Sequence, residues 1–444
     1  MSLRSNRRSR VTVLSAVAAT ACLTLAACSS SGGGGSSSST TTTTTTTGTT
    51  TTASTGTSGG GTASGTPIKI GYGASMSGPQ ASNGLSAQAV ATAFEKYTNA
   101  NGGIMGHPIQ VQMVDTKNTV PAATSVMKGF LADKSIDVIM LTDLVAEGAL
   151  VDTLKGADVA ILSGGGSSDL LWTSVPGVFQ NVSGSNYTIK AYVDQAKAGG
   201  AKTFGWAACA EVAVCSANGT KALAYAKTQG LGDAGEQLVS ATANDYTAQC
   251  LAFIGKKADS IAFNIGFTVG TRFATDCLQQ GYTGTFSVIN SGFDQQAFSK
   301  VSGFKSSGGT QGFPWWSTDP QVKIYRDAMA KYSPKGVVTS GNSTSIWSSF
   351  VLLKKAIEDA KPATIDRASI LDAFYKVKNE TLGGLLPQPT TFTKGQPSKP
   401  VACSWLFKYN AGEDNPTSIE PAKSGNGATG DLASTCVGYL PGLG

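Results

Sequence analysis

The sequence has a single histidine, His107, and its eight cysteines include no C-x-x-C pair. A Ser-His-Asp system would have to use His107, which stands in Gly-His-Pro, where a role in a turn is the better interpretation. A zinc site would lack the usual ligand spacing and nearby histidines. Carboxylate pairs occur, but none has a motif around it. We therefore predict no enzyme activity, no cofactor and no metal site.

Charged residues are also scarce, at 14% of the chain. The formal net charge of +6 falls to +2 when the four arginines among the first ten residues are left out. A nearly neutral body argues against a nucleic-acid partner. Beyond the N-terminal region, no segment reaches the ~20 apolar residues that a membrane-spanning helix needs.

The N-terminal region combines a basic start with a short apolar run over residues 11–26 that ends in Leu25-Ala26-Ala27-Cys28. This order predicts an export signal over residues 1–27. The small-small-Cys ending resembles the bacterial lipobox, in which the cysteine is acylated and becomes the first residue of the mature protein. The resemblance implies lipidation at Cys28 and a lipid-anchored protein on the outer face of the cell membrane. The alternative is an ordinary secreted protein cut near Ala27, with Cys28 incidental.

Residues 28–66 follow the signal and consist almost wholly of Ser, Thr and Gly, with no charged or aromatic residue. Such a segment cannot bury apolar surface, so we predict a flexible tether. The residues from 67 onward are numerous enough for two lobes, each with its own core.

Six cysteines remain after Cys22 and Cys28 are set aside, and an even number in an exported protein indicates disulfides. Sequence order suggests bridges between near neighbours, although six cysteines allow 15 pairings. The suggested pairs are Cys209 with Cys215, Cys250 with Cys277, and Cys403 with Cys436.

Short apolar runs alternate with segments of helical periodicity from residue 68 onward. Strands are expected at 68–72, 109–114, 138–141, 159–162, 203–207, 260–264, 286–289 and 404–409. Helices are expected at 85–97, 121–130, 147–155, 188–199, 217–229, 246–256 and 270–280, after Asp319-Pro320, and around 346–357. This alternation predicts an α/β fold of mainly parallel sheets flanked by helices.

Open α/β sheets bind ligands at the carboxyl ends of their strands. Small hydroxyl residues and backbone amides there suit a small polar or anionic group, although Ser and Gly also simply make turns. The candidate ligand-binding residues at strand ends are Ser75, Ser77, Asp143, Ser167, Ser168, Glu211, Phe267 and Asn290.

Four segments together resemble the opening of the leucine/isoleucine/valine-binding family, the type I periplasmic solute receptors of ABC importers. They are Ile68-Lys-Ile-Gly, Met76-Ser-Gly-Pro, Asn99-Ala-Asn-Gly-Gly-Ile-Met-Gly and Val114-Asp115. The resemblance covers roughly residues 68–409. It implies two lobes joined by three crossovers near residues 184, 312 and 399, with lobe 1 over 67–184 plus 313–399 and lobe 2 over 185–312 plus 400–440. It also implies that the lobes close on a solute and then dock to permease subunits.

The chain departs from the family's pattern at two places that matter for the ligand. Members that bind α-amino acids usually have a Ser-rich loop where this chain has Thr142-Asp143-Leu144-Val145-Ala146. They also place a carboxylate for the ligand's ammonium where this chain has Arg272 and no acid. A cation there attracts a carboxylate. Ser167 and Ser168 align with a ligand-contacting loop of the family.

These departures lead us to expect a ligand with a carboxylate or amide oxygen and an apolar or aromatic body. Trp315 could form an aromatic wall or could pack in the core. Arg272 could instead face solvent or pair with Asp276. The leading interpretation is a receptor of a branched-chain-amino-acid-type ABC importer. The alternative is an extracytoplasmic sensor for a small carboxylate, amide or aromatic ligand, and an exported enzyme is third.

Overall fold

The computed structural model of the chain describes residues 63–78, 81–165, 168–333 and 339–436. The expected signal peptide, Cys28, nearly all of the expected tether, and Ser167 lie outside these residues. Within them, no helix combines the length and apolar character needed to cross a membrane. His107 lies in a tight turn, where its backbone N–H donates to the Ile104 carbonyl at 3.0 Å.

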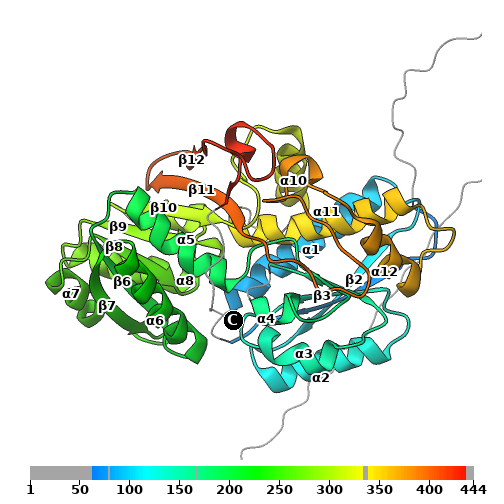
Figure 1. Cartoon of the computed structure of the whole chain (residues 1–444), viewed down its shortest axis with the longest axis horizontal. Coiled ribbons are helices and arrows are strands. Elements are labelled where there is room, and N and C mark those ends of the chain that lie inside the picture. The colour runs from blue at the N-terminus through cyan, green and yellow to red at the C-terminus, as the bar shows by residue number, and fades with distance from the viewer. Residues whose placement is uncertain (1–62, 79–80, 166–167, 334–338, 437–444) are drawn as a thin grey trace, which may run out of the picture. The chain divides into compact units, whose positions relative to one another are not determined.

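The first sheet contains five parallel strands in the order β2-β1-β3-β4-β5 (Figure 1). The strands are β1 (Ile68–Ala74), β2 (Ile109–Asp115), β3 (Val138–Thr142), β4 (Ala160–Ser163) and β5 (Val178–Phe179). Alternate residues of β3 belong to two different cores, with Met140 in one and Leu141 in the other. Both faces of this sheet are therefore covered, as its continuous apolar strands predict.

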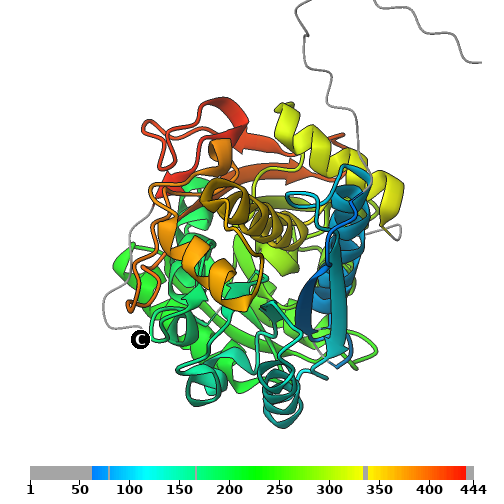
Figure 2. The ribbon, with the colours of Figure 1, turned by 90° about the vertical axis from the view of Figure 1, so that its right-hand side faces the viewer.

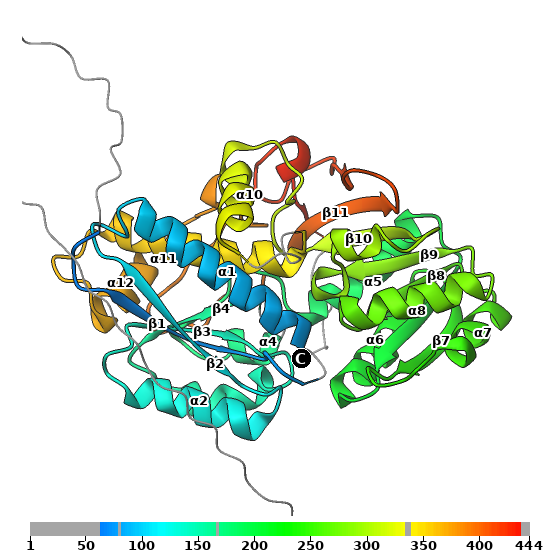
Figure 3. The same cartoon turned by 180° about the vertical axis from the view of Figure 1, so that it is seen from behind.

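Helices from two separate stretches of the chain, residues 81–172 and 320–376, cover this sheet. They are α1 (Ala81–Ala100), α2 (Val120–Ala132), α3 (Val151–Leu154), α4 (Asp169–Trp172), α10 (Pro320–Tyr332), α11 (Gly341–Ala360) and α12 (Arg367–Lys376), with the 3-10 turn η1 (Glu147–Leu150). Helices α1 and α11 lie on one side of the strands and α2 on the other (Figure 3). The blue α1 lies beside the yellow α10, from the distant part of the chain (Figure 2). Gly71 leaves room for α2, because a Cβ there would lie 2.8 Å from the Phe130 ring.

The second sheet is mixed and has the order β12-β11-β10-β9-β8-β6-β7, with β13 paired to β11. Its strands are β6 (Thr203–Cys209), β7 (Gly232–Val239), β8 (Ser260–Asn264), β9 (Thr285–Ile289), β10 (Lys305–Thr310), β11 (Cys403–Asn410), β12 (Thr417–Ile419) and β13 (Thr435–Cys436). Its helices are α5 (Ser185–Ala198), α6 (Ala213–Thr228), α7 (Thr247–Gly255), α8 (Phe267–Gln279) and α9 (Gln295–Phe298). The strands from β6 to β10 are parallel, and β11 and β12 are antiparallel to their neighbours. Strands β7, β10, β12 and β13 were not expected from the sequence.

The chain passes three times between the two sheets. It leaves the first sheet after β5, returns to its helices after β10, and goes back to the second sheet at β11. Two lobes with three crossovers make up the type I periplasmic-binding-protein fold, as the sequence predicted. Three disulfides, all in the second sheet or its helices, join Cys209 to Cys215, Cys250 to Cys277 and Cys403 to Cys436. These are the pairs that sequence order suggests.

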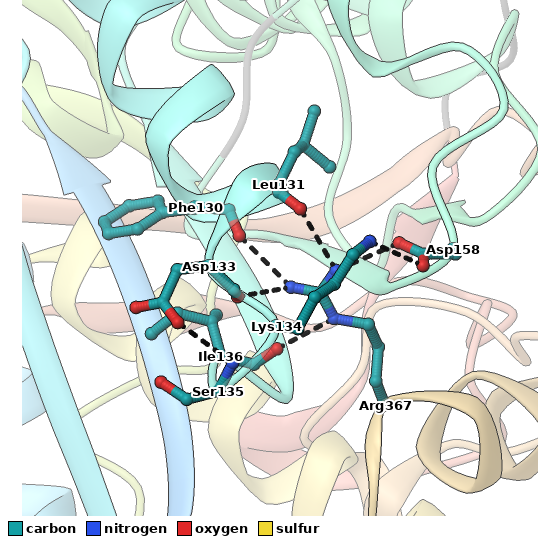
Figure 4. Close-up of polar contacts among 8 residues, drawn as sticks. All are labelled: Phe130, Leu131, Asp133, Lys134, Ser135, Ile136, Asp158 and Arg367. Carbon is teal, nitrogen blue, oxygen red and sulfur yellow. Dashed lines mark hydrogen bonds and ion pairs between the residues drawn. The ribbon is translucent and has the colours of Figure 1, made fainter.

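Arg367, at the start of α12, connects that helix by hydrogen bonds to the end of α2 and to the loop that follows it (Figure 4). Its guanidinium donates to four main-chain carbonyls at 2.9–3.3 Å, those of Phe130, Leu131, Asp133 and Ile136. It also forms an ion pair with Asp158 at 3.0 Å. The last carbonyls of a helix lack partners within the helix, and a planar guanidinium can serve several of them at once.

Candidate functional site

A cavity of about 660 Å³, measured to include its open mouth, lies at the carboxyl ends of strands from both sheets. Thr142 ends β3, Asn264 ends β8 and Asn290 follows β9, while Asn83 and Asn342 come from the first turns of α1 and α11. The complete lining is Asn83, Thr142, Leu144, Glu147, Gly165, Thr188, Ile189, Tyr192, Trp206, Asn218, Asn264, Ile289, Asn290, Gln311 and Asn342. Parallel strands therefore deliver the loops and helix starts of both lobes to one site.

The polar character of this lining is dominated by carboxamides. Six of its residues are Asn or Gln, and among the described lining residues the one charged side chain is Glu147. Neither Lys nor Arg occurs in this described lining. In the described part of the chain, no group of three or more His, Cys, Asp and Glu side chains is placed to hold a metal ion.

The hydroxyl of Thr142 forms its hydrogen bonds within the protein. Its oxygen lies 2.6 Å from the Gly164 carbonyl oxygen, to which it donates, and 2.7 Å from the Tyr72 hydroxyl. Because Thr142 has one proton to give, Tyr72 must donate to Thr142. Burial raises the pKa of Tyr72 well above its usual range, which keeps that proton in place. Thr142 therefore has no proton left for a ligand.

Three other donors in the lining are also used internally, each on a main-chain carbonyl. They are Thr188 Oγ1 to Gly184 at 2.7 Å, Tyr192 Oη to Phe263 at 2.5 Å, and Trp206 Nε1 to Cys215 at 3.2 Å. The hydroxyl and indole donors of the described lining thus hold the walls in place.

Hydrogen bonds also set the orientation of two carboxamides. Asn264 Nδ2 donates to the Cys215 carbonyl at 3.3 Å, which leaves Asn264 Oδ1 as the remaining acceptor. The backbone N–H of Gln311 donates to Asn290 Oδ1 at 2.7 Å, which leaves Asn290 Nδ2 as the remaining donor. Gln311 Nε2 donates to Thr188 Oγ1 at 2.9 Å, and this bond links the first turn of α5 to the residue that follows β10.

Glu147 connects the loops that follow β3 and β4. Its carboxylate accepts from the backbone N–H of Ser168 at 3.1 Å, from Trp172 Nε1 at 3.3 Å and from the backbone N–H of Asp143 at 3.4 Å. The residue is 1% exposed. These three N–H donors offset part of the cost of burying the carboxylate beside the cavity.

Of the residues proposed from the sequence, Asn290 lines the cavity. Ser168 lines an adjoining pocket that shares Leu144, Asn218 and Asn264 with it. Ser75 directly follows β1 and is buried, and Ser77 is exposed and donates to Asp115 at 2.6 Å. Neither serine is part of the lining.

Asp143 is fully buried and organises its own loop. It accepts from Thr116 Oγ1, from Asn118 Nδ2 at 3.2 Å, and from the backbone N–H groups of Val145 and Ala146 at 3.1 Å. Burial raises the pKa of this carboxyl, and the four hydrogen bonds act in the opposite direction. The side chain is a turn-forming Asp and does not belong to the lining.

Arg272 is exposed and lies in the second turn of α8, because the helix begins three residues earlier than expected. Its guanidinium donates to the carbonyls of Ala243 at 2.9 Å and Ala241 at 2.7 Å. Asp276, the alternative partner, accepts instead from the backbone N–H of Tyr246 at 2.8 Å. Arg272 is absent from the cavity lining and adds no cation to it.

The three other proposed residues also lie outside the lining. Glu211 is exposed and accepts from Ser240 and the Ala241 N–H at 2.7 Å. Phe267 is a buried residue at the start of α8. Trp315 packs edge-on against Trp316, and its indole N–H donates to Gln295 at 2.8 Å.

Sequence reasoning missed the asparagines that helices bring to the site. It searched strand ends, whereas Asn83, Asn218 and Asn342 lie on α1, α6 and α11. The sequence did contain one signal for these asparagines. Residues 341–345 read Gly-Asn-Ser-Thr-Ser, and they begin a helix whose later turns are apolar. A polar first turn ahead of an apolar helix body indicates a site, and all five of these residues are buried.

Comparison with known proteins agrees with this architecture. Residues 67–414 match the family described as periplasmic binding protein. The substrate binding protein LivJ of a branched-chain amino acid transporter from Streptococcus pneumoniae, solved with isoleucine, is 19% identical with a TM-score of 0.61, over 80% of this chain and 100% of its own. A leucine binding protein LivK from Thermotoga maritima is 15% identical, with a TM-score of 0.61. The match covers 80% of this chain and 99% of the LivK chain. A branched chain amino acid ABC transporter protein from Thermus thermophilus, solved with bound valine, is 13% identical, with a TM-score of 0.67. The match covers 80% of this chain and 95% of the Thermus chain. A comparison with curated proteins finds no match.

Proposed function

The chain belongs to the periplasmic binding protein family, and from this premise we propose that it is the extracytoplasmic substrate-binding lipoprotein of an ABC importer. In this role it captures a small solute between its lobes and delivers it to permease subunits. Lobe 1 comprises residues 67–184 and 313–399, and lobe 2 comprises 185–312 and 400–440. The chain acts as a carrier and carries out no reaction.

One observation carries this proposal. The same cavity is lined by Asn83 and Thr142 from the first lobe and by Asn264 and Asn290 from the second. A solute that contacts both lobes binds the closed arrangement more tightly than an open one, and so it shifts the population toward closure. The permease can then distinguish loaded from empty receptor by shape.

Closure of the lobes would turn about the crossovers, and two residues next to these crossovers are in contact. Thr188 follows the first crossover and Gln311 directly precedes the second, and their side chains are hydrogen-bonded at 2.9 Å. Both residues also line the cavity. A bound solute therefore touches the segments about which the lobes would turn.

A thermal-shift screen of small polar solutes tests the receptor function. A ligand at 100 times its Kd stabilises the folded protein by about 2.7 kcal/mol, which is readily measured. Trp206 lines the cavity, so the same ligand should change the intrinsic fluorescence. In Trp206→Phe the fluorescence response should shrink while the thermal shift persists. Absence of any stabilising solute in a broad screen would contradict the proposal.

The lipid anchor is tested separately. In cells that produce the full chain, Cys28→Ala should release the protein from the membrane fraction into the soluble fraction. Cys22→Ala is the matched control, because this cysteine lies inside the signal and should leave fractionation unchanged. A Cys28→Ala protein that stays in the membrane fraction would refute lipid anchoring and leave solute binding intact.

A further inference from the structure

The charges around the cavity are the first guide to its ligand. Its described lining has one charged side chain, the carboxylate of Glu147, and no Lys or Arg. Arg272 is turned to the carbonyls of Ala241 and Ala243 instead. A carboxylate or phosphate on a ligand would therefore meet a like charge with no described cationic side chain to offset it.

Hydrogen-bond donors are the second guide. Thr142, Thr188, Tyr192 and Trp206 each give their proton to a main-chain carbonyl. An anion needs several donors, and these four side chains offer it none. Asn290 Nδ2 remains as an oriented donor after Asn290 Oδ1 has accepted from Gln311.

Unused acceptors are the third guide. Asn83 is 5% exposed and lines the cavity, and its Oδ1 has no hydrogen-bond partner among the described residues. A buried acceptor without a partner costs free energy until a donor reaches it. Asn264 also lines the cavity, and its Oδ1 accepts no hydrogen bond from the described residues, while its Nδ2 gives one of its two protons to the Cys215 carbonyl. The two acceptors belong to different lobes, so a ligand that satisfies both also bridges the lobes.

From these observations, and resting on the proposed function, we infer that the cavity takes a small solute that presents several N–H or O–H donors and carries no carboxylate or phosphate. Polyols, amides and amines have this chemistry, whereas the isoleucine and valine of the solved relatives each carry a carboxylate.

Calorimetric titration of the purified mature protein with three sets of probes tests this inference. The first set is uncharged (myo-inositol, glucose, acetamide, urea), the second cationic (putrescine, agmatine), and the third anionic or zwitterionic (leucine, isoleucine, valine, benzoate, phosphate). The tightest probe of the first two sets should bind at least about tenfold more tightly than any of the third, the equivalent of one net hydrogen bond. Tightest binding by a member of the third set overturns the inference and leaves the receptor function intact. No binding in any set counts against both.

Two substitutions at Asn83 then examine the recognition itself. Asn83→Leu keeps a similar volume and removes the acceptor, so the best probe should bind about tenfold more weakly. Asn83→Asp keeps an oxygen acceptor and adds charge, so a cationic probe should bind more tightly and an uncharged one about equally. Asn101→Asp is the matched control, because it adds the same charge roughly 27 Å away along the direction of α1. If Asn83→Leu has the Tm of the wild type and binds the probe unchanged, the inference is overturned.

Discussion

Replacing Arg367 with Met should destabilise the first lobe without touching the cavity. Methionine keeps most of the packing of the arginine stem and removes its charge and its donors. Two of the lost hydrogen bonds, to the carbonyls of Phe130 and Ile136, are buried, and the others are partly buried. Each buried carbonyl left without a partner costs about 1–3 kcal/mol, while water replaces much of what the partly buried bonds contribute. The expected loss is about 2–6 kcal/mol of the free energy of unfolding.

The ion pair with Asp158 should account for little of this loss. The Asp158 side chain is 61% exposed, and it also pairs with Lys134 at 2.8 Å. Exposed pairs contribute about 0–1 kcal/mol. Asp158→Asn therefore serves as the matched control, since it removes the charge partner of Arg367 and leaves the four carbonyl contacts.

Urea titration followed by circular dichroism measures both effects. A lower midpoint at unchanged slope reports a change in stability, whereas a changed slope would indicate loss of two-state behaviour. Arg367→Met should lower the midpoint clearly, and Asp158→Asn should lower it slightly. Equal losses for the two variants, or a loss below about 1 kcal/mol for Arg367→Met, would refute the view that carbonyl capture stabilises this junction.

Three further predictions follow from the structure. Arg272→Ala should leave ligand affinity within about twofold, because Arg272 binds main-chain carbonyls outside the lining, and a tenfold loss by calorimetry would contradict this placement. Burial raises the pKa of Asp294 to about 6, so the folded state holds a proton that the unfolded state releases. The stability of the wild type relative to Asp294→Asn should therefore fall by up to ~3 kcal/mol as pH rises from about 4 to about 6, and parallel pH curves in urea titrations would refute this. Joint replacement of Cys209 and Cys215 by Ser should weaken ligand binding about tenfold, because the Cys215 carbonyl accepts hydrogen bonds from the lining residues Trp206 and Asn264. Removal of the Cys403–Cys436 disulfide should leave ligand binding unchanged.

Elements with strong local signals could be predicted from the sequence. Asp319-Pro320 begins α10 as expected, with Asp319 accepting from the Gln321 N–H at 2.8 Å. The apolar run at residues 138–141 is a fully buried strand. In both places the deciding interactions lie within a few residues of one another, so the sequence pattern contains them.

Strand β10 could not be predicted in this way. Its sequence, Lys-Ser-Ser-Gly-Gly-Thr, has a single β-branched residue, Thr310, and no aromatic one, whereas such residues are typical of strands. It forms because β9 and β11 pair with it on either side. The Phe407 ring of β11 occupies the space that a side chain at Gly308 would need. Pairing with β9 and with the sequence-distant β11 thus overrides the local preference of this segment.

The same distinction between local sequence pattern and long-range contacts applies to the candidate site. The sequence by itself determined the alternation of strands and helices, the near-neighbour order of the cysteines, and Asn290 at a strand end, because each depends on local pattern. Only the tertiary structure decided that Asn83 and Asn342 from distant helices share a cavity with Asn264. It also decided that the Arg272 guanidinium binds two carbonyls instead of entering that cavity. Side-chain direction depends on which partners the folded chain brings within about 3 Å, and no local pattern specifies those partners.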